Sequence, residues 1–99
     1  MLENCSIIGN MASSSSSADA RGGGVYIYSG TNTLTNCSIT GNTASSSTDA
    51  YGGGVYISNG TNTLLGTMNI TGNTVKNGST SSDNNLYLVS GYTVALSDS

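Results

Sequence analysis

The sequence predicts an all-β fold, a right-handed single-stranded parallel β-helix with three strands in each of about three coils of about 30 residues. The first observation is that RGGGVYIYSGTNTL, residues 21–34, returns thirty positions later as YGGGVYISNGTNTL, residues 51–64, with three letters changed. The second is that apolar residues alternate with polar ones inside these segments, as in a strand. The third is that Gly, Asn, Ser and Thr bound the segments, which argues against helical repeats.

Three strand types recur along the chain, and each is justified by its own pattern. The first alternates Val or Leu with Tyr, and the second centres on a Thr-Leu pair or its equivalent, with Leu2 as an earlier remnant. The third ends in Gly-Asn. They occupy, in that order, residues 25–27, 55–57 and 86–88; residues 33–34, 63–64 and 93–94; and residues 5–10, 37–42 and 68–73. We therefore expect one domain over 1–99, with coil boundaries at 1–21, 22–51, 52–82 and 83–99.

Stacked strands predict ladders of like side chains, one per coil, about 4.8 Å apart. The right-handed sense follows from the usual hand of parallel crossovers. The inward ladders are Val25, Val55 and Leu86; Ile27, Ile57 and Leu88; Leu34, Leu64 and Val94; and Ile39 with Ile70. Glycines 22–24 and 52–54 precede the first strand, where a corner needs positive φ or leaves no room for a Cβ.

A sulfur column is predicted inside the coil from Cys5, Cys37 and Met68, which fall in register. Parallel Cβ vectors about 4.8 Å apart exceed the usual disulfide separation of about 3.5 to 4.5 Å, so free thiols are favoured over a disulfide. Two thiols in a chain without His make no convincing zinc site, and no base is present to activate a thiolate.

Two outward ladders are candidate ligand or partner surfaces. Tyr26, Tyr56 and Tyr87 should form an aromatic stack that either stabilises the sheet or offers a platform for sugar rings or a partner protein. The other ladder is a threonine array, which resembles the ice-binding face of some β-solenoids but also suits any exposed strand. Its members are Thr31, Thr33, Thr61 and Thr63.

Composition narrows the function classes. With only Arg21 and Lys76 as cations, the chain cannot neutralise several phosphates, so nucleic acid is a poor partner. The apolar runs are too short to span a bilayer. Asp19 and Asp49 are expected one coil apart and would suit a glycosidase or Ca²⁺ site, but their loops are polar and Ser-rich. We expect no enzyme activity, no metal and no cofactor.

The coil ends are candidate assembly surfaces. They expose sheet edges, no cap is evident in the sequence, and the end of one copy is in phase with the start of another. Their residues are Leu2, Cys5 and Ile7 at one end and Leu86, Leu88, Val94 and Leu96 at the other. We expect either head-to-tail stacking of copies into a filament or neighbouring turns of a longer passenger domain.

The pairing of Gly-Gly-Gly-Val, at 22–25 and 52–55, with Ile-x-x-Asn, at 7–10, 39–42 and 70–73, resembles the chlamydial polymorphic membrane protein repeat. That family pairs a GGA[ILV]-type element with FxxN, so Ile stands here where the family has Phe. The third coil replaces the glycines with Asp83, Asn84 and Asn85. The resemblance implies a right-handed β-helix displayed outside the cell as an adhesin or stalk, with a host surface or glycan as a partner.

Overall fold

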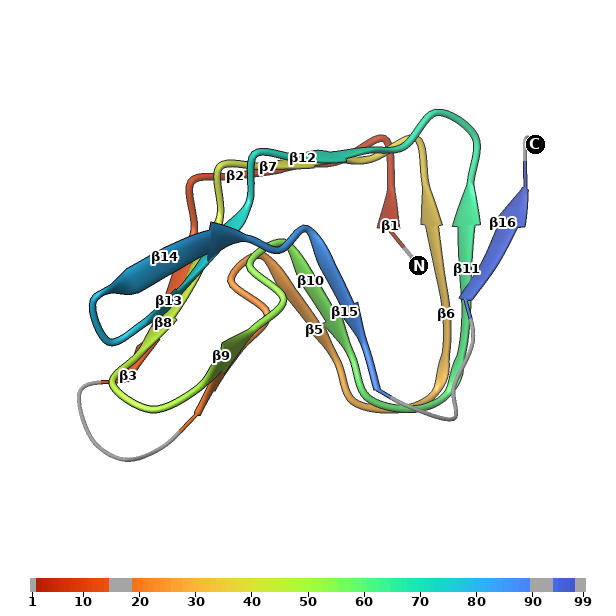
Figure 1. Ribbon diagram of the computed structural model, residues 1–99. Helices are drawn as coiled ribbons and strands as arrows, with labels where there is room; N and C mark the ends of the chain where they lie inside the picture. The colour runs from red at the N-terminus through yellow and green to blue at the C-terminus, as the bar shows by residue number, and fades with distance from the viewer. Residues whose placement is uncertain (1, 15–18, 90–93, 98–99) are drawn as a thin grey trace.

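The computed structural model describes residues 2–14, 19–89 and 94–97, and in these ranges the protein is all-β, with no helix (Figure 1). The strands form five sheets, which we name A to E. Sheet A contains β1 (Leu2–Glu3), β6 (Thr31–Thr35), β11 (Thr61–Leu65) and β16 (Val94–Ser97); sheet B contains β2 (Ser6–Ile8), β7 (Ser38–Thr40) and β12 (Asn69–Thr71); sheet C contains β3 (Met11–Ser14), β8 (Thr43–Ser46), β13 (Thr74–Asn77) and β14 (Thr80–Asp83); sheet D contains β4 (Ala20–Arg21) and β9 (Ala50–Tyr51); sheet E contains β5 (Val25–Ile27), β10 (Val55–Ile57) and β15 (Leu86–Leu88).

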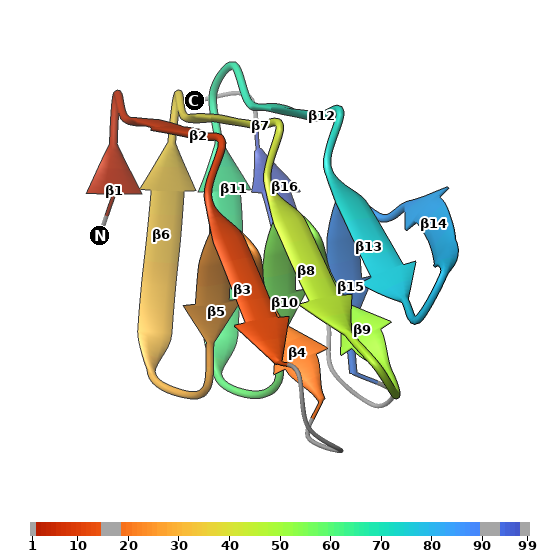
Figure 2. The ribbon, with the colours of Figure 1, turned by 90° about the vertical axis from the view of Figure 1, so that its left-hand side faces the viewer.

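Strands pair with their own copies from the neighbouring repeat. Val55 is the Cα partner of Val25 on one side and of Leu86 on the other, and the pairing is parallel. In Figure 2 the successive copies in a sheet lie side by side, as β6 and β11 do in sheet A. The predicted parallel register of the Val-Tyr-Ile segments is therefore confirmed, as is that of Ile39 with Ile70.

The number of strands in each repeat was predicted wrongly. The second repeat contains five strands, β5 to β9, instead of three, and each of them lies in a different one of the five sheets. The two extra strands, β8 and β9, come from a Ser- and Thr-rich segment that carries little apolar signal. They form because main-chain hydrogen bonds to an aligned copy do not depend on side-chain type, and because Ala44 and Ala50 supply the inward, buried positions.

The apolar core lies in two separate columns. The larger column contains the fully buried Ile39, Val55 and Ile57 and lies between sheets A, B and E. Cys37 is buried in the same column, with Cys5 and Met68 packed against it, and both cysteines are free, as expected. A smaller column between sheets C and D is made of Ala20, Ala44, Ala50 and Val75.

One ladder position was assigned wrongly. The Cα partner of Leu64 is Leu96, whereas Val94 is the partner of Asn62. Leu64 lies seven positions after Ile57, and the predicted pairing with Val94 left six positions after Leu88, whereas Leu96 lies eight positions after it. The third repeat thus has one more residue in this corner, and Thr93, the partner expected for Thr63, lies outside the described residues.

The Gly-Gly-Gly segments pass between the two columns, where the chain crosses close to sheet C. A Cβ on Gly23 would lie 2.5 Å from the carbonyl oxygen of Thr43, and one on Gly54 would lie 2.7 Å from the side-chain nitrogen of Asn73. Both separations are shorter than any ordinary contact. The absence of a side chain is therefore a steric requirement here, as the sequence predicted.

A ladder of asparagines runs beside these glycines, and its members are Asn10, Asn42, Asn73 and Asn85. Asn42 and Asn73 are fully buried. The Asn73 Oδ1 accepts the Asn42 main-chain N–H at 2.9 Å and its Nδ2 at 3.0 Å, and the Asn42 Oδ1 accepts the same two donors of Asn10 at 2.8 and 3.1 Å. Each buried side chain also donates to the preceding repeat, Asn42 to the Ile7 carbonyl at 2.9 Å. The ladder thus joins successive repeats through side chains as well as strands.

Sheet C ends in an antiparallel strand, so the expectation that the ends lack a cap fails for this one sheet. After Gly78 the chain turns back, and β14 pairs antiparallel with β13 in place of a further parallel copy. Its four residues, 80–83, are all exposed. Asn85 closes the asparagine ladder at the same end, because its Oδ1 accepts both the main-chain N–H and the Nδ2 of Asn73 at 3.0 Å.

Candidate interaction surfaces

The tyrosine ladder lies on sheet E, which stands at an angle to sheet D (Figure 1), and its rings contact Tyr51 and Arg21 of sheet D. Tyr56 has Tyr26 and Tyr87 as its two Cα partners, as the sequence predicted. The ring centroids of Tyr56 and Tyr87 are 5.2 Å apart with an interplanar angle of 2°, and those of Tyr26 and Tyr56 are 5.1 Å apart at 42°. The ladder is therefore a continuous aromatic stack across three repeats.

The stack is less exposed than an open platform would be. Tyr56 retains 8% of its exposed area, because neighbours from sheet D cover it. The Tyr51 ring lies 6.2 Å from that of Tyr56, and the guanidinium carbon of Arg21 lies 5.7 Å from its centroid. The expectation of an outward ladder with every ring available to a ligand is corrected accordingly: Tyr26, at 43%, and Tyr28, at 71%, present the open aromatic surface.

The charged groups near the stack are Asp49 and the ion pair of Arg21 with Asp19. Arg21 Nη2 lies 3.3 Å from Asp19 Oδ2. Desolvation lowers the pKa of Arg21, but its hydrogen bond with Tyr26 and the nearby Tyr56 and Asp19 oxygens outweigh this and raise the pKa above its ordinary value. The pKa of Tyr51 is also raised above its ordinary value, because desolvation and the negative charges of the nearby aspartates both disfavour the tyrosinate.

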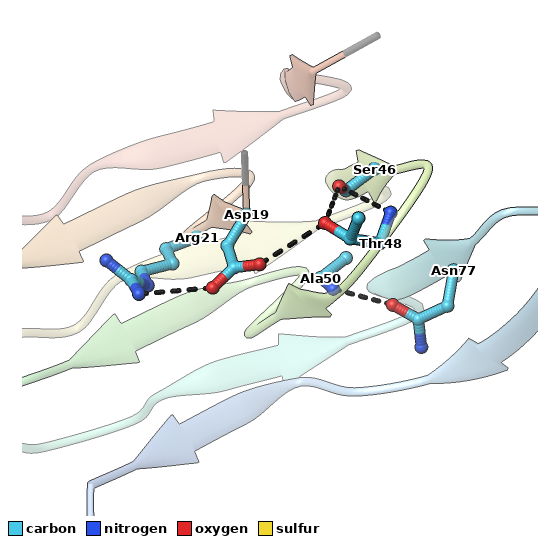
Figure 3. A network of polar contacts seen from close by, with 6 residues as sticks. All are labelled: Asp19, Arg21, Ser46, Thr48, Ala50 and Asn77. Carbon is cyan, nitrogen blue, oxygen red and sulfur yellow. Dashed lines mark hydrogen bonds and ion pairs between the residues drawn. The ribbon is translucent and has the colours of Figure 1, made fainter. Parts of the chain in front are cut away.

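Asp19 also joins a polar network that ties two repeats together (Figure 3). Its Oδ1 accepts the Thr48 hydroxyl at 3.3 Å, and Thr48 in turn contacts the Ser46 hydroxyl at 3.1 Å. Among the described residues no cluster of three or more carboxylate, thiol or imidazole groups could hold a metal ion. Both oxygens of the Asp19 carboxylate therefore have hydrogen-bond donors within the chain, Arg21 for one and the Thr48 hydroxyl for the other.

The threonines form two aligned rows on sheet A. Thr61 pairs with Thr31 and Thr63 with Thr33, as predicted. Thr31 and Thr61 are exposed, whereas Thr33 and Thr63 are half-buried. The row of Thr33 and Thr63 continues to Ala95 in β16. The array is thus limited to two hydroxyl rows in the described part of sheet A.

The two ends of the molecule differ. At the N-terminal face, the outermost strands of the five sheets are β1, β2, β3, β4 and β5. Sheet A has one strand more than sheet E on this side, and a hollow of about 180 Å³ opens where the missing strand would lie. Leu2, Val25, Ile27 and Leu34 line it. At the C-terminal face, β14 and Asn85 close sheet C and the asparagine ladder.

The predicted assembly residues divide between these faces. Leu2, Cys5 and Ile7 lie at the N-terminal face and are partly buried against the core. Leu86 and Leu88 lie in β15, the C-terminal edge of sheet E, and Val94 and Leu96 lie in β16, the corresponding edge of sheet A. The asparagine ladder was missed as a structural device, although the repeated Gly-Asn ending of the third strand type was its signal.

Comparison of the chain with protein-family models, with curated proteins and with solved structures finds no match. In the part of the chain that the structure describes, no helix has the length and apolar character needed to cross a membrane.

Proposed function

We propose that the chain is a non-enzymatic structural protein, an extracellular or cell-surface right-handed β-solenoid that extends end to end as a stalk, adhesin segment or filament. The observation that carries this proposal is the in-register pairing of near-identical repeats. Val25, Val55 and Leu86 follow one another across sheet E, and Leu34 and Leu64 do so across sheet A. Such an array grows in one direction by adding equivalent units, which suits a spacer or scaffold.

The right-handed path is the ordinary one for parallel strands joined by crossovers. The buried polar groups support a structural role, since Asn42 and Asn73 use their amides on the backbone and on each other. Display outside the cell follows from the resemblance of the Gly-Gly-Gly-Val and Ile-x-x-Asn elements to surface-protein repeats. Self-association is the partner interaction that the open sheet edges favour.

End-to-end stacking would use the N-terminal face of one copy and the C-terminal face of another. The hollow lined by Leu2, Val25 and Leu34 would receive an apolar strand of the first type, such as β15, provided that the β16 following it displaces β1 from the edge of sheet A. Sheets A, B, D and E end in the parallel strands β16, β12, β9 and β15, which can accept a further copy. In sheet C, β14 occupies that place and opposes stacking there.

A segment exchange tests this proposal sharply. Residues 77–85 and 46–54 are both nine residues long and occupy equivalent positions, because Asn77 pairs with Ser46 and Leu86 with Val55. Replacing 77–85 with a copy of 46–54 should exchange the cap for a strand like β9. We expect the wild type to assemble only at high concentration and the exchanged protein to form filaments at lower concentration, as seen by light scattering and electron microscopy.

Matched lysine variants identify the face. Val25→Lys places a charge in the hollow and should abolish assembly, whereas Thr31→Lys, on the exposed side of sheet A, should leave it intact. Circular dichroism checks that both variants remain folded. A monomer at every concentration for both the wild type and the exchanged protein would contradict end-to-end assembly.

Carbohydrate binding is a second candidate, and the exposure of Tyr26 and Tyr28 is the observation that favours it. Tyr26 lies in β5 and Tyr28 directly follows that strand, with the two ring centroids 6.5 Å apart, so a sugar ring could stack on either. Glycan-array binding that is lost in Tyr28→Ala but kept in Thr31→Ala would support this function. Ice binding through the threonine rows is a weaker alternative, because only two rows are aligned in the described sheet.

A further inference from the structure

Five tyrosines form one connected aromatic cluster. Neighbouring ring centroids are 6.5 Å apart for Tyr28 and Tyr26, 5.1 Å for Tyr26 and Tyr56, 5.2 Å for Tyr56 and Tyr87, and 4.9 Å for Tyr87 and Tyr51. The rings come from three successive repeats, so residues far apart in the sequence are held in contact. The cluster concentrates oxidisable phenols at one place on the molecule.

Within the cluster one pair is aligned for covalent coupling. Tyr56 and Tyr87 are Cα partners on hydrogen-bonded strands, and their rings are parallel to within 2°. The two phenol rings thus lie in parallel planes with their centroids 5.2 Å apart, at the same position on adjacent strands. The other four ring pairs of the cluster are tilted, with interplanar angles between 36° and 47°.

The surroundings restrict which partners a tyrosyl radical can meet. Tyr28 is 71% exposed and so offers an oxidant direct access to one end of the cluster. Tyr56 is buried beneath Tyr51 and Arg21, so a radical at that ring can couple only with a neighbour in the same molecule. Cys37, a competing thiol, is buried in the core and away from this surface.

We propose that Tyr56 and Tyr87 are the site of an intramolecular dityrosine cross-link, formed by a haem peroxidase with hydrogen peroxide as the oxidant. Each phenol loses one electron and one proton to give a neutral phenoxyl radical. The two radicals join through one bond between their ortho carbons, and each ortho hydrogen then moves to a phenol oxygen, which restores both aromatic rings. Hydrogen peroxide takes up the two electrons and two protons and gives two molecules of water.

The cross-link would act as a covalent clamp between repeats. It closes a loop from residue 56 to residue 87 and restricts the unfolded chain, in the manner of a disulfide. The sulfur column does not provide such a clamp, because both cysteines are free. The proposal concerns a single chain and does not depend on end-to-end assembly.

The test treats dilute full-length protein with a plant haem peroxidase and hydrogen peroxide. We expect a monomer lighter by two hydrogen atoms, dityrosine fluorescence, and a cross-linked peptide that joins Tyr56 to Tyr87 by mass spectrometry. Tyr87→Phe keeps the ring and the fold but should lose this product. Tyr28→Phe, the matched control, should retain it, since Tyr26 also offers a partly exposed ring to the oxidant. The cross-linked wild type should melt at a higher temperature than the untreated protein.

A second arm separates folded geometry from random encounter. A ruthenium photo-oxidant with persulfate remains active in concentrated urea, and unfolding should remove the intramolecular product. The proposal is overturned if dityrosine forms only in covalent dimers, if Tyr51–Tyr87 is the predominant linkage, or if the yield is the same in urea as in native buffer.

Discussion

Replacing Asn42 by Ala removes the centre of the asparagine ladder, and the structure allows its cost to be worked out. The Ile7 carbonyl loses its side-chain donor at 2.9 Å, and the Asn10 amide loses its acceptor at 2.8 Å. The Asn73 Oδ1 keeps the main-chain donor of residue 42 and loses the side-chain one. A buried group left without a partner costs about 1–3 kcal/mol. Because Asn10 is exposed and water can replace its acceptor, we expect a total loss of about 2–4 kcal/mol.

Urea unfolding followed by circular dichroism measures this loss. A domain of this size has a free energy of unfolding of about 5–15 kcal/mol, so the change should be plain in the transition midpoint. Asn10→Ala is the control, because that residue lies exposed at the end of the ladder and its loss should cost under about 1 kcal/mol. Equal effects of the two variants would refute the reasoning that burial of the ladder makes it stabilising.

The remaining predictions concern sterics, core packing and alkaline pH. Gly53→Ala would place a Cβ 2.6 Å from main-chain atoms of the next repeat and should lower the free energy of unfolding by about 3 kcal/mol or more. Gly78→Ala, where φ is +64° and the space around the residue is open, should lower it by about 1 kcal/mol. The midpoints of urea unfolding compare the two variants. Ile39→Ala should lower stability by about 2–5 kcal/mol and the exposed Ile8→Ala by under about 0.5 kcal/mol in the same assay. Because folding raises the pKa of Tyr51, the neutral phenol contributes to folding stability. This contribution is fully present below the unfolded pKa, near 10.0, and is lost as pH rises through the folded pKa. The melting temperature of Tyr51→Phe should therefore fall less than that of the wild type as the pH rises above about 10. An equal fall in the wild type and the variant would contradict this.

An Asn42→Asp variant would add a pH signature to the ladder prediction. One oxygen of its carboxyl would keep the two Asn10 donors, but the other would face the Ile7 carbonyl and the Asn73 Oδ1, both acceptors. Because the site is also fully buried, the folded protein would favour the protonated form and raise the pKa of the new group. Stability should be greatest below the unfolded carboxyl pKa, about 3.9, and fall as pH rises through the folded value. Stability that increases over this range would show that the ladder geometry is wrong.

The sequence predicted the register where side chains carry a strong pattern. Val25 with Val55 and Tyr26 with Tyr56 follow directly from the repeated letters and from alternation. It did not predict β8 and β9, because small polar residues contribute to a sheet through their backbones and leave no hydrophobic period to detect. The one-residue displacement of Leu96 relative to Leu64 was hidden for a similar reason, since corner length is not constrained by any core position.

The surfaces were harder to predict than the ladders. The burial of Tyr56 depends on Tyr51 and Arg21, which belong to strands that alternation did not reveal. The cap was missed because 77–85 has the same length as its counterpart 46–54 and differs only in composition. Without the glycines of the earlier repeats, this segment turns back along β13, and that antiparallel choice is set by tertiary packing.

The matched spacing of the first two repeats has a consequence for how such a protein can change in size. Val25 and Val55 occupy the same place in adjacent layers, and so do Leu34 and Leu64. Tandem duplication of residues 22–51 would therefore insert a whole layer, lengthening the molecule by about 4.8 Å without creating a new kind of contact. Insertions of any other length would displace every later layer, so viable length variants should differ by complete layers.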